Sequence, residues 1–243
     1  MTEYNPFDAD LDALTAKDLQ VLGDVSEGWY VEYKSNVVNA SAIAKSISAF
    51  ANTYGGWLFF GIEEKSKDEP VAGRFIGISQ DSIDAGLQSI RNAVSQCLNP
   101  APFYRVAIIR DEDHILQMEA GAAIICVQVP LGSEAPYIHN SGRVYRRVGD
   151  SSDPKPESDR FVLDQLWRRG EKIRDEYRNW IKRDLELSKG EAKQPYFRLF
   201  VTPDLWRDRD IWADLTTKKV RDLFNSGPSA ETIFTTPFDC VYK

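Results

Sequence analysis

The chain has 243 residues, 42% of them hydrophobic and 28% charged, which provides for one large domain or two small ones with a real core. Its net charge of -7 argues against a protein that coats nucleic acid through bulk charge, although a local basic patch can exist on an acidic body. The sequence has no apolar run long enough for a bilayer and no signal peptide at its acidic N-terminus, so we expect a cytoplasmic protein without membrane contact.

Cysteine and histidine usage limits the chemistry further. Cys97, Cys126 and Cys240 are an odd number, lie far apart and form no CxxC motif, which suits free thiols in a reducing cytosol. With only His114 and His139 in the chain, a histidine-rich metal site is not expected. A bound metal would be held by carboxylates, which favours Mg²⁺ or Mn²⁺.

The N-terminal part predicts a short helix and a strand. Leucines at helical spacing predict a helix over Asp8–Leu22 that covers an edge of the fold. Alternation predicts a strand over Tyr30–Ser35, in which Glu32 and Lys34 share one face. Val31 and Tyr33 then point the other way.

The next stretch predicts a helix, a glycine turn and a buried strand in direct succession. The helix begins near Ala40, with Asn39 or Ser41 as its N-cap, and ends at Gly55 in the left-handed conformation. Its buried face is expected to contain Ile43, Ile47, Phe50, Ala51 and Tyr54. Lys45, Ser48 and Asn52 fall on another face. The continuous apolar run Trp57–Ile62 predicts a central strand, which ends at Glu63 and Glu64.

The remaining elements define the fold class. A second amphipathic helix is predicted over Ser82–Leu98. Extended segments are predicted at Arg74–Ser79, Tyr104–Arg110, Ile115–Met118 and Ala122–Val129, and a hairpin at Tyr137–Ile138 and Arg143–Val148. We expect an α+β fold with a mixed, mostly antiparallel sheet packed by two amphipathic helices, followed by a long helix and a small α/β C-terminal part.

Two linkers divide the chain. The Gly-, Ser-, Asp- and Pro-rich segment Gly149–Glu157 predicts a boundary, and Ser188–Gln194 predicts another. We expect a domain over residues 1–155, a long amphipathic helix within 156–187 (Phe161–Leu185) and a C-terminal segment over 188–243 with a helix near Arg207–Asn225. The last stretch, Gly227–Lys243, does not complete a recognisable structural element, which is compatible with a chain cut from a longer protein.

Four pieces in fixed order resemble the Schlafen AlbA-like domain family. They are ExxxxEYK at 27–34, AFANTYGG at 49–56, GIEE at 61–64 and YRRVGDSS at 145–152. The family occurs in bacterial proteins and in vertebrate Schlafens and is associated with DNA binding. The resemblance covers about residues 20–155 and implies a nucleic-acid-binding protein with RNA or DNA as its partner.

The resemblance also implies a site. In nucleolytic members, two glutamates of the ExxxxE stretch and one acidic residue at the strand end bind a divalent metal and cleave structured RNA. Carried over, Glu27, Glu32, Lys34 and Glu64 are the catalytic candidates, and the three glutamates are the ligands of Mg²⁺ or Mn²⁺. The family more usually has aspartate at the strand end, and the extra methylene of glutamate displaces the carboxylate.

The residue types themselves suit this chemistry. Clustered carboxylates holding a metal activate water and neutralise a scissile phosphate, and a nearby lysine stabilises the developing charge. Glu27 lies five residues before Glu32, so a straight strand would place them on opposite faces, and a bend at Gly28 is needed to bring them together. The competing interpretation is a surface pair, Glu32–Lys34, and a solvated turn at Glu64.

A second candidate patch lies on the predicted strand at Arg143–Val148. Arg143, Tyr145 and Arg147 share a face there, which suits phosphate contacts and base stacking, with Lys45 and Asn52 lining the same groove. Arg146 faces the other way and is expected to pair with an interior carboxylate. The alternative is an edge strand guarded by charge.

Three functions stay open at this point. The first is a Mg²⁺- or Mn²⁺-dependent endoribonuclease that acts on tRNA-like structured RNA. The second is a non-catalytic DNA- or RNA-binding regulatory module. The third is a sensor that forms a homodimer through the long helix or binds ATP, although the sequence has no GxxxxGK[ST] motif to support nucleotide binding.

Overall fold

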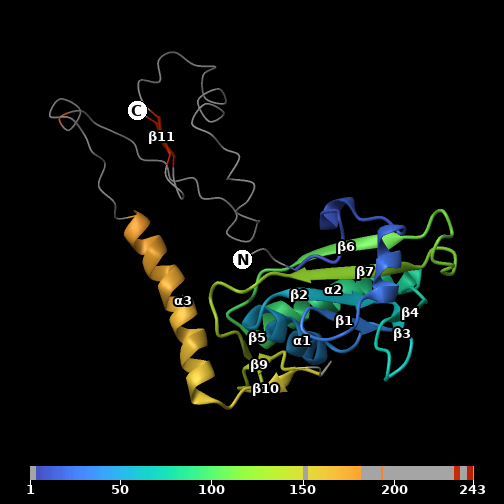
Figure 1. Cartoon of the computed structure of the whole chain (residues 1–243), viewed down its shortest axis with the longest axis horizontal. Coiled ribbons are helices and arrows are strands. Elements are labelled where there is room, and N and C mark those ends of the chain that lie inside the picture. The colour runs from blue at the N-terminus through green and yellow to red at the C-terminus, as the bar shows by residue number, and fades with distance from the viewer. Residues whose placement is uncertain (1–3, 150–152, 182–192, 194–232, 236–239, 243) are drawn as a thin grey trace. The chain divides into compact units, whose positions relative to one another are not determined.

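A computed structural model describes residues 4–149, 153–181, 193, 233–235 and 240–242 of the chain (Figure 1). The chain divides into two units, Glu3–Arg183 and Asp184–Lys243. All the candidate site residues lie in the first unit. Among the described residues, none of the helices has the length and apolar character that crossing a membrane requires.

The first unit is built on a four-stranded mixed sheet (Figure 1). Its strands lie in the order β1, β2, β7, β6. They span Val31–Lys34, Gly56–Phe60, Ala123–Val129 and Arg105–Arg110, respectively. β1 is parallel to β2, whereas β2–β7 and β7–β6 are antiparallel. The predicted mixed, mostly antiparallel sheet is confirmed.

Both faces of the sheet are covered, so β2 is buried along its whole length. Leu58 and Phe60 pack with α1 (Ala40–Asn52) and α2 (Gln80–Cys97). Trp57 and Phe59 alternate with them and pack with the N-terminal segment. The unbroken apolar run of this strand follows from that double coverage.

The N-terminal cover is formed by two short 3₁₀ helices, η1 (Leu11–Ala13) and η2 (Asp18–Asp24), so the prediction of one helix over 8–22 is wrong. Between them the Thr15 N–H donates to an Asp18 carboxylate oxygen at 2.8 Å. That bond takes the place of the i−4 carbonyl contact that a continuous helix would need.

α1 begins and ends nearly as predicted. The Asn39 side chain accepts a hydrogen bond from the Ala42 N–H at 2.9 Å, which makes Asn39 the N-cap. Gly55 adopts φ +77°, and an added Cβ would lie 2.8 Å from the Val129 carbonyl oxygen, so only glycine fits this turn. Because the helix has already ended, Tyr54 departs from the helical spacing and is 45% exposed, contrary to the prediction that it is buried.

Three small antiparallel pairs flank the sheet. These are β3 (Ile62–Glu64) with β4 (Ala72–Phe75), β5 (Leu98–Asn99) with β8 (Ile138–His139), and β9 (Tyr145–Arg146) with β10 (Lys155–Pro156). The segment predicted to be extended at Ile115–Met118 forms no strand, because the Asp111 carboxylate accepts hydrogen bonds from the backbone N–H groups of this segment. It therefore folds as a loop around that side chain.

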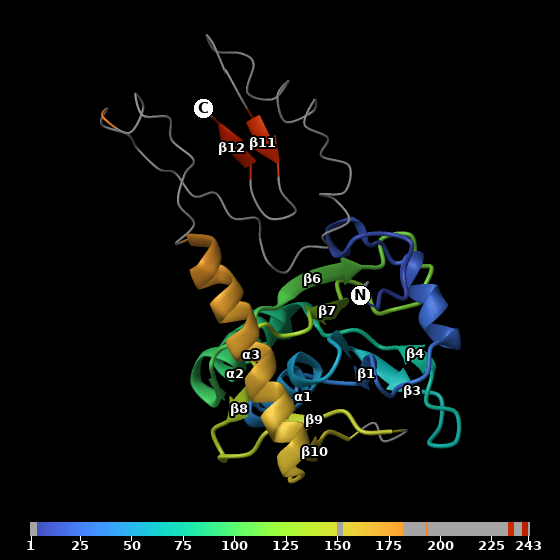
Figure 2. The ribbon, with the colours of Figure 1, turned by 60° about the vertical axis from the view of Figure 1, so that its left-hand side comes forward.

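The long helix α3 (Arg160–Ile181) belongs to the first unit, and the N-terminal half of the helix packs against the rest of that unit (Figure 2). Leu166 joins the core cluster of α1 and α2, and an Arg169 guanidinium nitrogen donates to the Ala51 carbonyl at 3.0 Å. In the second unit, β11 (Ile233–Thr235) and β12 (Cys240–Tyr242) form an antiparallel pair. The predicted helix near Arg207–Asn225 lies outside the described residues, as does the predicted linker Ser188–Gln194 except for Lys193.

Candidate nucleic-acid site around the Glu32–Arg147 pair

The site begins at a turn before β1. The Gly28 N–H donates to the Val31 carbonyl at 3.0 Å, and the Glu27 N–H donates to the Pro70 carbonyl at 2.7 Å. The chain therefore bends at Gly28, as the sequence predicts. Beyond the turn, β1 directs Val31 and Tyr33 into the core and leaves Glu32 and Lys34 on the other face.

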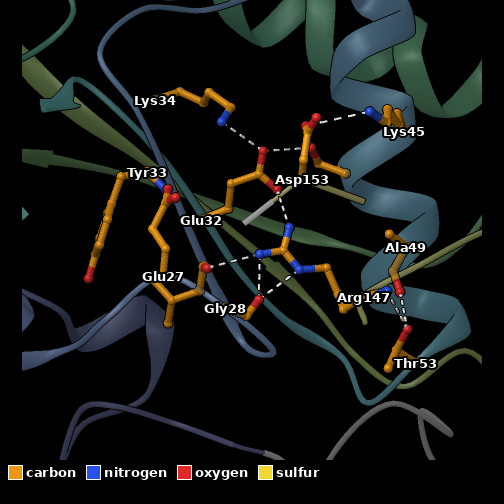
Figure 3. Close-up of polar contacts among 12 residues, drawn as sticks. Glu27, Gly28, Glu32, Tyr33, Lys34, Lys45, Ala49, Thr53, Arg147 and Asp153 are labelled. Atoms are coloured by element: carbon orange, nitrogen blue, oxygen red, sulfur yellow. Dashed lines mark hydrogen bonds and ion pairs between the residues drawn. The ribbon is translucent and has the colours of Figure 1, made fainter. Parts of the chain in front are cut away.

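Glu32 is the centre of a buried network and is only 2% exposed (Figure 3). One carboxylate oxygen accepts from Arg147 Nη1 at 2.8 Å. The other accepts from the Ser46 hydroxyl at 2.8 Å and lies 3.0 Å from Lys34 Nζ. Two cations and a hydroxyl thus compensate one buried carboxylate, which is what burial of a charge requires.

Arg147 has no exposed surface, so the structure reverses the expected orientation of this strand. Its guanidinium donates to the Gly28 carbonyl through Nε at 2.7 Å and through Nη2, and it lies over the Phe50 ring at 4.8 Å from the centroid. Burial lowers the pKa of Arg147, against the attraction of Glu32 and Glu27. Arg147 is therefore an internal partner of Glu32 and is not exposed to contact a phosphate.

The neighbouring side chains of the predicted patch also differ from expectation. Arg146, expected to have an interior partner, pairs with the partly buried Glu157 at 2.7 Å. Tyr145 is buried, with the Lys45 ammonium 5.6 Å from its ring centroid and the His139 ring against it, so it offers no open face for base stacking. Arg143 is exposed.

Asn52, expected to line the groove, is buried and holds a loop in place. Its amide nitrogen donates to the carbonyls of Tyr137 and Tyr145 at 2.9 and 3.0 Å. Its oxygen accepts from the Tyr137 N–H at 2.8 Å. Asn52 thus holds β9 and the segment at Tyr137 against α1.

Glu27 differs from Glu32 in having an unsatisfied oxygen. It is 7% exposed, its Oε1 accepts from the Tyr33 N–H, and its Oε2 is buried with no hydrogen-bond partner. Burial raises the pKa of Glu27 to about 7. The Tyr33 hydrogen bond and Lys34 oppose this rise, and the nearby charges of Glu64 and Glu32 add to it.

Lys34 lies within the field of all three predicted carboxylates. Burial lowers its pKa, but attraction to Glu32, Glu27 and Glu64 together with the Glu32 hydrogen bond raises the pKa overall. Glu64, at the end of β3, is itself exposed. The structure thus brings Glu27, Glu32 and Lys34 into one network, with Glu64 at its exposed side.

These carboxylates do not fit a metal centre as they are arranged. Both oxygens of Glu32 are taken by Arg147, Lys34 and Ser46, and the ammonium of Lys34 occupies the space beside them. Over the described ranges, no group of three or more His, Cys, Asp or Glu side chains is placed to hold an ion. Of the two buried glutamates, only Glu27 has an oxygen, Oε2, without a hydrogen-bond partner.

Four cations at the surface belong to the elements that carry the network or lie next to them in the chain or in the sheet. We call this set the basic rim and define it as Lys34, Lys45, Arg143 and Lys155. Lys34 and Lys45 are each about one-third exposed at the side chain, and Arg143 and Lys155 are exposed. Figure 3 shows Lys34 and Lys45 on either side of Glu32 and Asp153. The highly exposed Asp153 lies 3.5 Å from Lys45 Nζ.

Sequence reasoning missed the roles of Ser46 and Arg147. Ser46 lies one residue after Lys45 in α1, and its hydroxyl is the neutral donor to Glu32. The alternation of Arg147 with Tyr145 predicts that they share a face, but it does not predict that this face is buried. The partners that hold Arg147 inside, Glu32 and the Gly28 carbonyl, lie 115 and 119 residues away in the chain.

Comparison with known proteins assigns the chain to a family. The family model described as "Schlafen, AlbA_2" matches residues 27–156. Among solved structures, the DIP2311 protein from Corynebacterium diphtheriae is 22% identical with a TM-score of 0.35; the match covers 58% of this chain and 24% of that one, so this chain spans about a quarter of its length. The matched range contains the turn at Glu27, the Glu32–Arg147 pair and the basic rim, and the chain belongs to the Schlafen AlbA_2 family, which is associated with nucleic-acid binding.

Proposed function

We propose that this chain binds nucleic acid through the basic rim without cleaving it, and that its buried carboxylates serve to position the rim. The observation that carries the proposal is the Glu32–Arg147 pair, in which a fully buried guanidinium neutralises the glutamate that would otherwise be the central metal ligand. Because Arg147 and Lys34 already neutralise the Glu32 carboxylate, its role in this proposal is to stabilise the fold and not to bind a metal.

The pair links the elements that present the rim. Glu32 belongs to β1, Ser46 to α1, and Arg147 directly follows β9. Lys34 extends from the same strand as Glu32, and Lys45 precedes Ser46. Lys34 and Lys45 are therefore attached to elements that the buried network holds together, which reduces the conformational entropy that a phosphate contact would cost.

The test is a salt titration of binding to labelled tRNA-like RNA and to duplex DNA of matched length. Lys45→Gln and Arg143→Gln each remove one rim cation and are expected to lower the slope of log K against log salt by about 1. Arg91→Gln in α2 is the matched control, because Arg91 bonds to Gln88 of its own helix and lies outside the rim. Its slope should equal that of the wild type.

Equal slopes for the rim variants and the control would contradict the proposal, as would binding that does not respond to salt. Phosphate contacts alone carry no sequence information, so a difference in affinity between the two ligands at equal slope would show that contacts other than those of the rim contribute.

A second candidate function is a Mg²⁺- or Mn²⁺-dependent endoribonuclease acting on tRNA-like RNA. The observation that favours it is the unpaired, buried Oε2 of Glu27, together with the nearby charge of Glu64. This function requires Glu32 to exchange its present cationic partners for a metal. Glu27, Glu32 and Glu64 would then be the ligands, with Lys34 beside them.

Incubation of tRNA with the protein and Mn²⁺ separates the two candidates. The binding proposal predicts intact RNA for the wild type and for Glu27→Gln, which keeps the shape of the side chain but removes its charge. Cleavage by the wild type that is lost in Glu27→Gln would establish the nuclease. Equal cleavage by both proteins would indicate a contaminating enzyme.

A further inference from the structure

A cavity lies beside the turn that precedes β1. Its volume is about 350 Å³, within the range of pockets that hold small molecules. Glu27, Trp29 and Tyr30 of the turn line it, together with Tyr4 and Pro70 from other segments. Gly28 also lines the cavity and its carbonyl accepts from Arg147, so the cavity adjoins the buried Glu32–Arg147 pair.

The wall of the cavity is aromatic and partly accessible. The Tyr4 and Tyr30 rings stack with centroids 4.6 Å apart and an interplanar angle of 20°. Tyr54, which is not part of the wall, contacts both Trp29 and Tyr30, at centroid distances of 5.6 and 6.0 Å. Trp29 and Tyr30 are only half-buried and Tyr54 is exposed. Rings of this kind stack on the flat face of any base.

One polar group gives the cavity a chemical preference. Glu27 is more than nine-tenths buried, and its Oε2 has no partner. A carboxylate repels phosphate, so the group that enters should be the base and not the backbone. The unpartnered oxygen is covered in the free protein, so a rotation of the Glu27 side chain would turn it toward an N–H donor in the cavity. Adenine, cytosine and guanine offer an exocyclic amino group for this contact, whereas uracil and thymine offer only the ring N3–H.

We propose that this cavity receives one unpaired, amino-bearing base of the nucleic-acid strand, with the base stacked on Trp29 and its amino group directed to Glu27. The inference rests on the proposed function, since Lys34 and the other rim cations would hold the phosphates of the same strand. It adds a specific binding site for a single-stranded or extruded base to a surface that by itself recognises only phosphates.

The experiment compares two strands of about twelve nucleotides with equal phosphate numbers, one of deoxycytidine and one abasic throughout. The cytidine strand should bind roughly tenfold more tightly, and Trp29→Leu should abolish that difference while leaving the abasic strand unaffected. A deoxyuridine strand, which lacks the amino group, should fall between the two. Trp167→Leu is the matched control, because it removes an exposed tryptophan of α3.

A phosphate-free probe separates this inference from the proposed function. Cytidine alone, at millimolar concentration, should shift the indole N–H resonance of Trp29 in the wild type. If cytidine produces this shift but no strand binds, the base site stands and the nucleic-acid function falls. If strands bind equally with and without bases and cytidine shifts nothing, the base site is wrong and the rim stands.

A folding control keeps the result interpretable. Trp29→Phe retains an aromatic ring and should keep most of the preference for the cytidine strand, whereas Trp29→Leu should lose it. Thermal melting of both variants checks that the fold is intact. A loss of preference in Trp29→Phe equal to that in Trp29→Leu, with both proteins folded, would contradict stacking as the source of affinity.

Discussion

At the residue scale, Glu27 makes stability depend on pH in an unusual direction. Its pKa in the folded protein is about 7, above the ordinary value of 4.5, because the side chain is buried. The folded state therefore binds more protons than the unfolded state between these values, so this group reduces stability as pH rises through the window. Glu27→Gln, which cannot ionise but can still accept from the Tyr33 N–H, should remove the effect.

Urea unfolding of the wild type and of Glu27→Gln at pH 4.5 and at pH 8 measures this pH dependence of stability. The variant should gain stability relative to the wild type as pH rises, by up to about 3 kcal/mol at pH 8, with little difference at pH 4.5. Comparing the two proteins cancels the titration of all other groups. A difference that does not change with pH would show that Glu27 ionises normally in the fold.

The buried pair makes a second prediction at this scale. Arg147→Met should destabilise the protein by about 3–5 kcal/mol, because Glu32 then remains buried without its guanidinium partner. Combining Arg147→Met with Glu32→Leu removes both charges and should cost much less than the sum of the two single changes. Urea unfolding of the four proteins completes the cycle. Additive losses would mean that the two charges do not interact.

The Glu32–Arg147 pair shows which side-chain orientations can be predicted from the sequence and which cannot. Glu32 and Lys34 share a face because strand alternation is local, and that prediction is confirmed. Whether Arg147 points inward is not local: the answer depends on the placement of Glu32 and the Gly28 carbonyl, both remote in the chain. The general exposure of arginine favoured the wrong choice.

At the scale of elements, a substitution at Gly170 of α3 tests whether this helix packs against the loop at Ala135. Gly170→Ala in an exposed helix would stabilise by about 1 kcal/mol. Here the added Cβ would lie 2.4 Å from the Ala135 carbonyl oxygen, so the sign should reverse. We expect a lower melting temperature and faster hydrogen exchange in α3.

Gly23→Ala in η2 is the matched control, because no atom lies within 4 Å of its added Cβ and its backbone conformation suits alanine. It should leave the melting temperature unchanged or slightly higher. A rise in melting temperature for both variants would mean that α3 does not rest on the loop at Ala135.

The elements that sequence reasoning missed share one physical cause. Both helices of the core and the central strand follow the hydrophobic periods and were predicted within a few residues. The helix at 8–22 and the extended segment at 115–118 were not found as predicted. In each, an aspartate carboxylate, Asp18 or Asp111, takes backbone N–H groups that the regular element would have used. Hydrophobic periodicity does not detect that competition.

At the scale of the whole molecule, association with a second copy stays a prediction. On α3, Phe161 and Trp167 are exposed, as a helix that pairs with another chain would require. The part of the predicted helix at 182–185 and most of the C-terminal segment lie outside the described residues. Nucleotide binding likewise stays a prediction that no described contact tests.

The net charge of the whole molecule and the small number of rim cations determine how strongly binding depends on salt. The chain carries a net charge of -7, so in the proposed function attraction to phosphate comes from the four cations of the rim acting against an acidic body. Each phosphate contact contributes about 0.9 to the salt slope on duplex DNA and about 0.7 on a single strand. The expected slopes are therefore no steeper than roughly -3.6 and -2.8.

Fluorescence anisotropy over a range of about 50 to 200 mM salt measures these slopes directly. A slope steeper than about -6 on either ligand would require more phosphate contacts than the rim contains, and would place the binding surface elsewhere on the chain. A shallow slope with measurable affinity would instead fit a protein that gains part of its binding from stacking, because contact with a base releases few counterions. The ratio of slope to affinity therefore separates the contribution of the rim from that of the aromatic cavity in the unmodified protein.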